Sequence, residues 1–253
     1  MRHRQIDLNA DLGEDPAGTE GDALLLGLVT SANVACGGHA GEAASMRALA
    51  RLCLAHGVAL GAHPSYPDRA GFGRRESSLS TSEIESAVFE QIAALAGVAR
   101  EEGATLAHVK PHGALYHACS RQAEVATAVG RAVRALDPRL RLVAEAGSPA
   151  LTLWHSMGFE VSAEAFADRR YEPDGRLRAR LVPGALIESP QQAAEQAVRI
   201  ALGRGALLDD GSILPLAADT LCLHGDTPHA LELARAVRAA LESAGLRVAA
   251  PRA

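Results

Sequence analysis

Short apolar runs alternate with helical patterns along most of the chain. Each run is rich in aliphatic residues and is followed by a polar cluster, as is typical of a strand buried on both faces of a parallel sheet. The runs are Ile6–Leu8, Ala32–Ala35, Val58–Ala62, Leu106–Val109, Leu140–Ala144, Phe159–Val161 and Thr220–Leu223. We therefore expect seven strands, most of them followed by a helix.

The segments between these runs carry helical signals. One buried helix face is predicted by the spacing of Met46, Leu49, Ala50, Cys53 and Leu54. Ser80-Thr-Ser-Glu83 has the pattern of a capping box before a second apolar stripe. Ser189-Pro190 and Thr227-Pro228 each place a cap residue before a proline at the first helical position.

Repeated strand–helix alternation predicts parallel strands joined by right-handed crossovers. An open doubly wound sheet and a closed barrel both satisfy this pattern, but the number and even spacing of the strands favour an α/β fold of the (β/α) barrel type. A length of 253 residues suits a single barrel domain over residues 1–253. The segments Arg69–Ser78 and Arg170–Pro183 are long for connections and are candidate rim loops or lids.

Charge and hydropathy exclude several classes of partner. The net charge is −5 and no basic run exceeds two residues, which argues against a nucleic acid or an anionic membrane as a partner. No apolar stretch approaches the ~20 residues that span a bilayer, and the first residues lack the apolar core of a signal peptide. The four cysteines form no C-x-x-C pair, so we expect free thiols in a cytoplasmic protein.

Two rare residue types mark candidate functional positions. Of 25 basic residues only Lys110 is a lysine, and Asn9 and Asn33 are the only asparagines. Lysine is a compact point charge whose protonation can change on burial, and arginine does not replace it in that role. We therefore infer that Lys110 has a specific role.

Polar residues gather after most of the predicted strands, where the active sites of such folds lie. Burying many unpaired polar groups costs about 1–3 kcal/mol each, so a shared ligand explains them better than stability does. The candidate catalytic residues are Asp11, His63, Lys110 and His112. The candidate substrate-binding residues are Asn9, Asn33, His39, Tyr116, Glu164, Asp168, Arg169, His224 and Asp226.

Several common catalytic motifs are missing from the sequence. It contains no P-loop, no Gly-x-Gly-x-x-Gly turn and no Gly-x-Ser-x-Gly elbow. The mechanisms left by these exclusions are general acid–base catalysis by carboxylate and imidazole groups and metal-assisted hydrolysis.

Seven sequence blocks resemble those of the LamB/YcsF lactam-utilisation family. The blocks begin with Asp7-Leu-Asn-Ala-Asp-Leu-Gly-Glu14, Ser31-Ala-Asn-Val-Ala-Cys-Gly-Gly-His-Ala-Gly41 and Gly61-Ala-His-Pro64. They continue with Gly71-Phe-Gly-Arg-Arg75, Val109-Lys-Pro-His-Gly-Ala-Leu-Tyr116, Glu164-Ala-Phe-Ala-Asp-Arg169 and His224-Gly-Asp226. The resemblance covers nearly the whole chain, although Ala10, Gly38, Glu42 and Ser65 depart from the family pattern.

The resemblance implies a seven-stranded barrel of the glycoside hydrolase/deacetylase type. It also implies ATP-dependent conversion of 5-oxoproline to L-glutamate, with two partner subunits, B and C. Because the chain has no nucleotide motif, we expect a partner subunit to handle ATP, the co-substrate.

The roles of individual residues are hypotheses. We expect Lys110 to hold the substrate carboxylate or phosphoryl oxygens, Asp11 to act as general base, and His63 or His112 to protonate the ring nitrogen. Asn9, Asn33, His39, Asp168 and Arg169 would orient the substrate. One alternative is a metal-dependent deacetylase or amidohydrolase acting alone, with ligands from Asp11, His39, His63 and His112. A non-catalytic scaffold within a complex is another, and a divalent metal stays unassigned.

Overall fold

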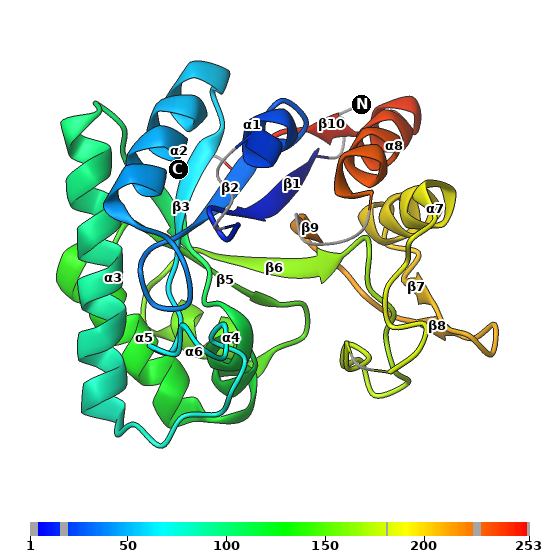
Figure 1. Cartoon of the computed structure of the whole chain (residues 1–253). Helices are drawn as coiled ribbons and strands as arrows, with labels where there is room; N and C mark the ends of the chain where they lie inside the picture. The colour runs from blue at the N-terminus through cyan, green and yellow to red at the C-terminus, as the bar shows by residue number, and fades with distance from the viewer. Residues whose placement is uncertain (1–4, 16–19, 181, 225–228, 252–253) are drawn as a thin grey trace.

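Seven parallel strands close into a barrel in the computed structural model, which describes residues 5–15, 20–180, 182–224 and 229–251 (Figure 1). The strands are β1 (Gln5–Leu12), β2 (Ser31–Ala35), β3 (Ala59–His63), β4 (Leu106–Val109), β5 (Arg141–Glu145), β6 (Val161–Phe166) and β9 (Thr220–His224). Each strand pairs in parallel with the next, and β9 also pairs with β1 to close the ring. The predicted seven-stranded (β/α) barrel is confirmed.

Three short strands lie outside the ring. Strand β10 (Arg247–Val248) extends the sheet beside the start of β1. Strands β7 (Ala206–Leu207) and β8 (Ile213–Leu214) form an antiparallel pair between β6 and β9. With two residues each, these strands are too short to give a periodic signal in the sequence, and none of them was predicted.

Helices surround the ring, and their caps match the expected signals where the structure describes them. They are α1 (Glu20–Leu26), α2 (Ala43–His56), α3 (Thr81–Glu101), α4 (Gly113–Arg121), α5 (Ala123–Leu136), α6 (Pro149–Ser156), α7 (Pro190–Ala201) and α8 (Ala230–Ser243). Ser80 and Glu83 form the predicted capping box of α3. Ser189 caps α7 with Pro190 in its first turn. Thr227-Pro228 lies outside the described residues.

Strands β1 and β6 differ from their predicted bounds. The sixth strand was predicted at Phe159–Val161 but runs from Val161 to Phe166, and β1 extends beyond Leu8 to Leu12. Phe159 instead closes the turn after α6, where its backbone N–H donates to Trp154 O at 3.0 Å. Both predictions were wrong for the same reason: the inward positions of these strands are polar, and polar residues in a sequence resemble a loop.

The interior of the barrel is therefore polar. In β1, Leu8, Ala10 and Leu12 belong to the buried hydrophobic core. The alternate residues point into the barrel: Asp7 and Asn9 bond to Thr220 on the neighbouring strand β9, and Asp11 pairs with Lys110. Many barrels of this class fill the interior with branched aliphatic residues instead. At the amino-terminal mouth, a cavity of about 70 Å³ is lined by Asp7, Ser31, His108, Arg141 and Ser162, among others.

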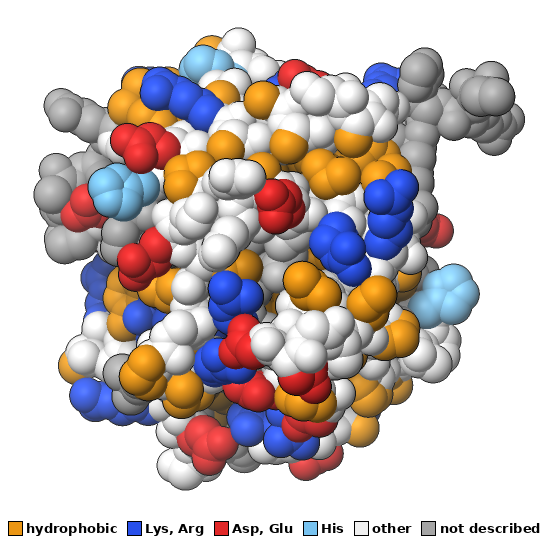
Figure 2. All heavy atoms as spheres, turned by 90° about the vertical axis from the view of Figure 1, so that its right-hand side faces the viewer, with side chains coloured by type: hydrophobic (Ala, Val, Ile, Leu, Met, Phe, Trp, Pro, Cys, Tyr) orange, Lys and Arg blue, Asp and Glu red, His pale blue; other side chains and the backbone are white. Residues whose placement is uncertain are grey.

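The long segment after β6 is tied to the β7–β8 pair by ion pairs. The Arg178 guanidinium lies 2.8 Å from Glu172 and 2.7 Å from Asp209, and Arg170 lies 3.4 Å from Asp209. On the face shown in Figure 2, basic and acidic side chains are interspersed with hydrophobic ones. Among the described helices, none is long and apolar enough to cross a membrane.

Candidate active site

The four candidate catalytic residues meet at the carboxyl-terminal mouth of the barrel. Lys110 Nζ lies 2.8 Å from Asp11 Oδ1, and His63 Nε2 lies 3.3 Å from Asp11 Oδ2. His112 Nδ1 lies 3.0 Å from His63 Nε2. These side chains come from the ends of β1, β3 and β4 and from the residue before α4. The convergence expected from the sequence is therefore present.

Lys110 is the buried centre of an ionic network. Its ammonium pairs with Asp11 and, at 2.9 Å, with Glu164, and it donates to Cys222 Sγ at 3.2 Å. Tyr116 Oη donates to the second oxygen of Glu164 at 2.8 Å. Burial alone would lower the pKa of Lys110, but the neighbouring groups, Asp11 first among them and then Cys222 and Glu164, together outweigh burial and raise that pKa well above its ordinary value. The lysine therefore stays charged.

Asn9 and Asn33 lie inside the barrel beneath this network. Asn33 Nδ2 donates to Asn9 Oδ1 at 2.7 Å and to Asp11 Oδ1 at 2.8 Å. Asn9 Nδ2 donates to Glu164 Oε1 at 3.0 Å, and Asn33 Oδ1 faces His108 Nε2 at 2.7 Å. The two amides therefore donate hydrogen bonds to Asp11 and Glu164, the carboxylates that pair with Lys110. Their expected contact with substrate stays a prediction, and the bonds assign them a positioning role.

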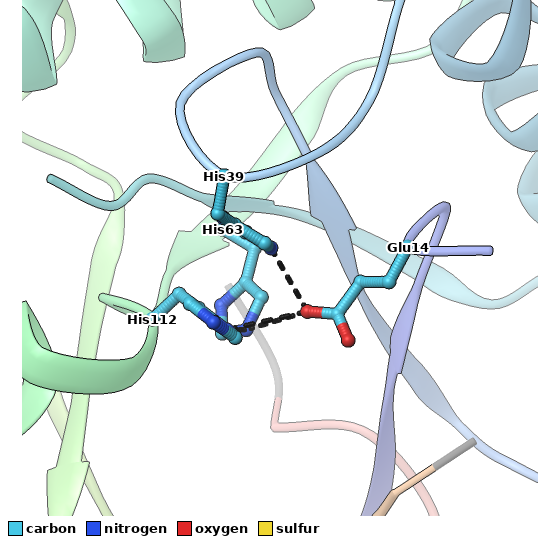
Figure 3. Close-up of side chains that lie close together, drawn as sticks. All are labelled: Glu14, His39, His63 and His112. Carbon is cyan, nitrogen blue, oxygen red and sulfur yellow. Dashed lines mark hydrogen bonds and ion pairs between the residues drawn. The ribbon is translucent and has the colours of Figure 1, made fainter. Parts of the chain in front are cut away.

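A second cluster joins Glu14 to three histidines, and Figure 3 shows the four side chains pointing toward one another. Glu14 Oε1 lies 2.9 Å from His39 Nε2, 3.2 Å from His112 Nδ1 and 3.7 Å from His63 Nε2. The rings of His39 and His112 stack with their centroids 3.6 Å apart. Gly13, with φ at +76°, makes the turn after β1 that leads to Glu14.

Burial and hydrogen bonds shift the ionisation of this second cluster in opposite directions. Burial lowers the pKa of His39 to about 4. Burial would raise the pKa of Glu14, but the surrounding imidazoles outweigh burial and lower that pKa well below its ordinary value. Glu14 is thus a carboxylate surrounded by imidazoles.

A third group consists of Asp168 and His224. Asp168 is fully buried and accepts from the backbone N–H of His224 at 3.1 Å, while its Oδ2 lies 3.0 Å from His224 Nδ1. This bond orients the imidazole, and His224, Asp11 and Cys222 offer ligand atoms within 4.8 Å of one another. A carboxylate-oriented histidine is a common general acid or base.

Arg169 is a buried cation in the segment that follows the carboxyl end of β6. Its side chain is buried and Nη2 donates to Arg178 O at 2.7 Å, while Nε finds no hydrogen-bond partner among the described residues. An unpaired buried donor of this kind can bind a substrate carboxylate. Asp226, also expected at the site, lies outside the described residues.

Several residues in or beside the site carry no signal in the sequence that marks them as functional. Glu14 ends the first sequence block, but nothing in the pattern showed that a turn directs it toward histidines. Cys222 has the appearance of ordinary strand core. His108 could face either side of its strand, and it faces inward to Asn33. Phe72 contributes a backbone oxygen to His112, which only the fold of its loop could reveal.

The geometry defines a (β/α) barrel with a polar, acid–base-capable site at its carboxyl-terminal mouth. Over residues 6–253 the chain matches the LamB/YcsF family, and it belongs to that family.

Named relatives and a solved structure agree with this assignment. The chain is 51% identical to the A subunit of 5-oxoprolinase from Chloroflexus aggregans, over 98% of this chain and 99% of that protein. Its identity to the A subunit of 5-oxoprolinase from Methylococcus capsulatus is also 51%, over 98% and 96% of the two chains. The crystal structure of a lactam utilization protein from Thermus thermophilus superposes with a TM-score of 0.91 at 45% identity, covering 98% of this chain and all of that one.

Proposed function

We propose that this chain is the A subunit of an ATP-dependent 5-oxoprolinase and helps to open the lactam ring of 5-oxoproline to L-glutamate. The observation that carries the proposal is full-length similarity, at 51% identity, to relatives with that name. The mouth of the barrel supports it, because the groups that lactam hydrolysis needs lie together there: a buried cation, an oriented imidazole and carboxylates.

The chemistry explains the need for ATP. An unstrained five-membered lactam is a poor electrophile. Transfer of the γ-phosphoryl group of ATP to the lactam oxygen releases ADP and turns that oxygen into a good leaving group. Water then adds to the ring carbon, and the C–N bond breaks as the ring nitrogen takes a proton, which leaves the side-chain carboxyl of glutamate as an acyl phosphate. A second water hydrolyses this acyl phosphate to L-glutamate and phosphate. Because the sequence has no nucleotide motif, we assign the handling of ATP to one of the partner subunits B and C.

The contacts support a specific role for each of these residues. Arg169, with its unpaired Nε–H, binds the substrate carboxylate. Lys110 faces the phosphoryl oxygens, held in place by Asp11 and Glu164. His224, oriented by Asp168, accepts a proton from the attacking water and passes one to the ring nitrogen. Asn9, Asn33 and Tyr116 fix the two carboxylates that position Lys110.

A glutamate-release assay tests this function. With 5-oxoproline and ATP, we expect release when this chain is combined with subunits B and C, and none when B and C are combined without it. ATP-coupled turnover by B and C alone would contradict the proposal and favour a scaffold role for this chain.

One observation favours a second candidate, a metal-dependent amidohydrolase that acts alone. Glu14, His39, His63 and His112 have ligand atoms within 4.8 Å of one another, as a hydrolytic metal site requires. The same assay separates the two candidates. Release of product by the isolated chain, without ATP, would replace the ATP-dependent function with this one.

A further inference from the structure

The hydrogen bonds of His63 fix where its proton lies. His63 Nδ1 is 2.7 Å from the backbone oxygen of Lys110, and a carbonyl oxygen can only accept. Nδ1 therefore carries the hydrogen, and in the neutral ring the lone pair is on Nε2. That nitrogen faces the centre of the cluster, 3.3 Å from Asp11 and 3.7 Å from Glu14.

His112 is fixed in the opposite tautomer. Its Nε2 is 3.0 Å from the backbone oxygen of Phe72 and must be the donor of that bond. Its Nδ1 therefore carries the lone pair, and it lies 3.0 Å from His63 Nε2. In the two neutral imidazoles, the lone pairs of His63 Nε2 and His112 Nδ1 therefore face each other with no hydrogen between them. Glu14 Oε1, 3.2 Å from His112 Nδ1, is a third acceptor at the same point. A proton on His63 Nε2 would pair the two imidazoles alone, whereas a metal ion at the centre contacts all three atoms.

The spacing of the three atoms suits a metal ion. Ligand atoms about 2.0–2.1 Å from a tetrahedral ion lie roughly 3.3 Å from one another. The three separations here are 3.0 Å between the two histidines, 3.2 Å from Glu14 to His112 and 3.7 Å from Glu14 to His63. We infer that Glu14, His63 and His112 bind one divalent first-row transition-metal ion, because two imidazoles and a carboxylate suit such ions better than Mg²⁺ or Ca²⁺.

His39 has a different place in this metal site. Its ring lies parallel to that of His112, with 6° between the planes, so the in-plane lone pairs of the two rings run side by side and do not converge on one point. Its Nε2 is 2.9 Å from Glu14 Oε1 and can donate to that carboxylate. His39 therefore orients the Glu14 ligand, as outer partners of metal ligands commonly do.

Three protein ligands leave a coordination position for a water molecule or a substrate oxygen. A metal-bound imidazole nitrogen has no proton to give, so His63 and His112 cannot also be the proton donors expected from the sequence. This assigns proton transfer to His224 and polarisation of the lactam oxygen to the metal. The catalytic role of the metal rests on the proposed function, but metal binding itself does not.

Metal binding is measured on the untagged full chain after removal of metal by a chelator, without ATP or partner subunits. Calorimetric titration with Zn²⁺ is expected to give one ion per chain. The substitutions His63→Ala and His112→Ala are each expected to weaken binding at least 100-fold, and His39→Asn about 10-fold. His56→Ala, at an exposed histidine on α2, is the control and keeps wild-type affinity.

A spectroscopic measurement distinguishes loss of a metal ligand from misfolding of a variant. Co²⁺ bound by the wild-type chain is expected to give the visible absorption of a low-coordinate site, and Glu14→Gln, with a native circular dichroism spectrum, is expected to change that absorption. The inference is overturned if neither Zn²⁺ nor Co²⁺ binds in a one-to-one ratio. It is also overturned if the double variant H63A/H112A binds as tightly as the wild-type chain. Metal binding by the isolated chain and glutamate release by the complex are separate measurements, so failure of this inference can be distinguished from failure of the proposed function.

Discussion

At the scale of residues, Lys110 is held by two carboxylates, and all three side chains are buried. Its side chain is 3% exposed, and those of Asp11 and Glu164 are 8% and 0% exposed. Removing one member of a buried ionic group leaves its partners uncompensated, which costs far more than losing a surface ion pair. The lysine therefore contributes to stability as well as to any chemistry.

Replacement of Lys110 by methionine is expected to lower the free energy of unfolding by about 3–5 kcal/mol, because Asp11 and Glu164 then lose their shared cation. Urea unfolding measures the change. Arg139→Met, at an exposed ion pair with Asp137, is the control and costs under about 1 kcal/mol. We expect the double variant K110M/E164Q to lose less than the sum of the two single variants. Strict additivity of K110M and E164Q would contradict a coupled network.

Glu145 gives a prediction about pH. Burial, followed by the charge of Glu164, raises its pKa to about 7, and its Oε1 has no hydrogen-bond partner in the described part of the chain. The folded state therefore holds a proton that the unfolded state releases above its ordinary pKa of 4.5. The stabilising contribution is complete at low pH and is lost as the pH rises through about 7.

The variant Glu145→Gln removes this titration. Relative to the wild-type chain, its free energy of unfolding is expected to rise by about 2 kcal/mol between pH 5 and pH 8. Denaturant unfolding at several pH values measures the difference. Glu90→Gln, at an exposed position of α3, should show no such trend. A difference between E145Q and wild type that stays constant across this range would refute the raised pKa.

At the scale of elements, local signals set the helices more accurately than the strands. Caps act within one turn, so Ser80 and Ser189 could be assigned from neighbouring residues alone. Strand bounds depend on what lies across the ring. Ser162 and Glu164 in β6, like Asn9 and Asp11 in β1, point into a polar interior and imitate a loop in the sequence.

The cap of α3 provides the test at this scale. Ser80→Ala removes the acceptor for Glu83 N–H and the reciprocal capping box, so the free energy of unfolding is expected to fall by about 1 kcal/mol. Thermal unfolding measures the loss. Ser86→Ala, at an exposed position inside the same helix, should be neutral or slightly stabilising, because alanine is the better helix former. An equal loss in both variants would mean that the cap contributes nothing.

At the scale of the whole molecule, the sequence pattern did not decide between a closed barrel and an open sheet. The alternation of elements allowed an open sheet, and the decisive contact pairs β1 with β9, for example Leu8 with Leu221. The site was predictable as a set of strand-end residues because parallel strands bring these ends to one mouth. The partners within it were not predictable: the bond of His112 to Phe72 and the turn to Glu14 depend on the folded loops.

A reconstitution experiment tests whether the polar groups at the carboxyl-terminal mouth perform the reaction. It measures the kcat of glutamate release from 5-oxoproline and ATP by this chain reconstituted with subunits B and C. His224→Gln should lower kcat at least 100-fold, because the oriented imidazole can no longer transfer protons. Arg139→Ala, at the opposite mouth of the barrel, should leave kcat unchanged. Wild-type turnover by the His224→Gln complex would contradict the account.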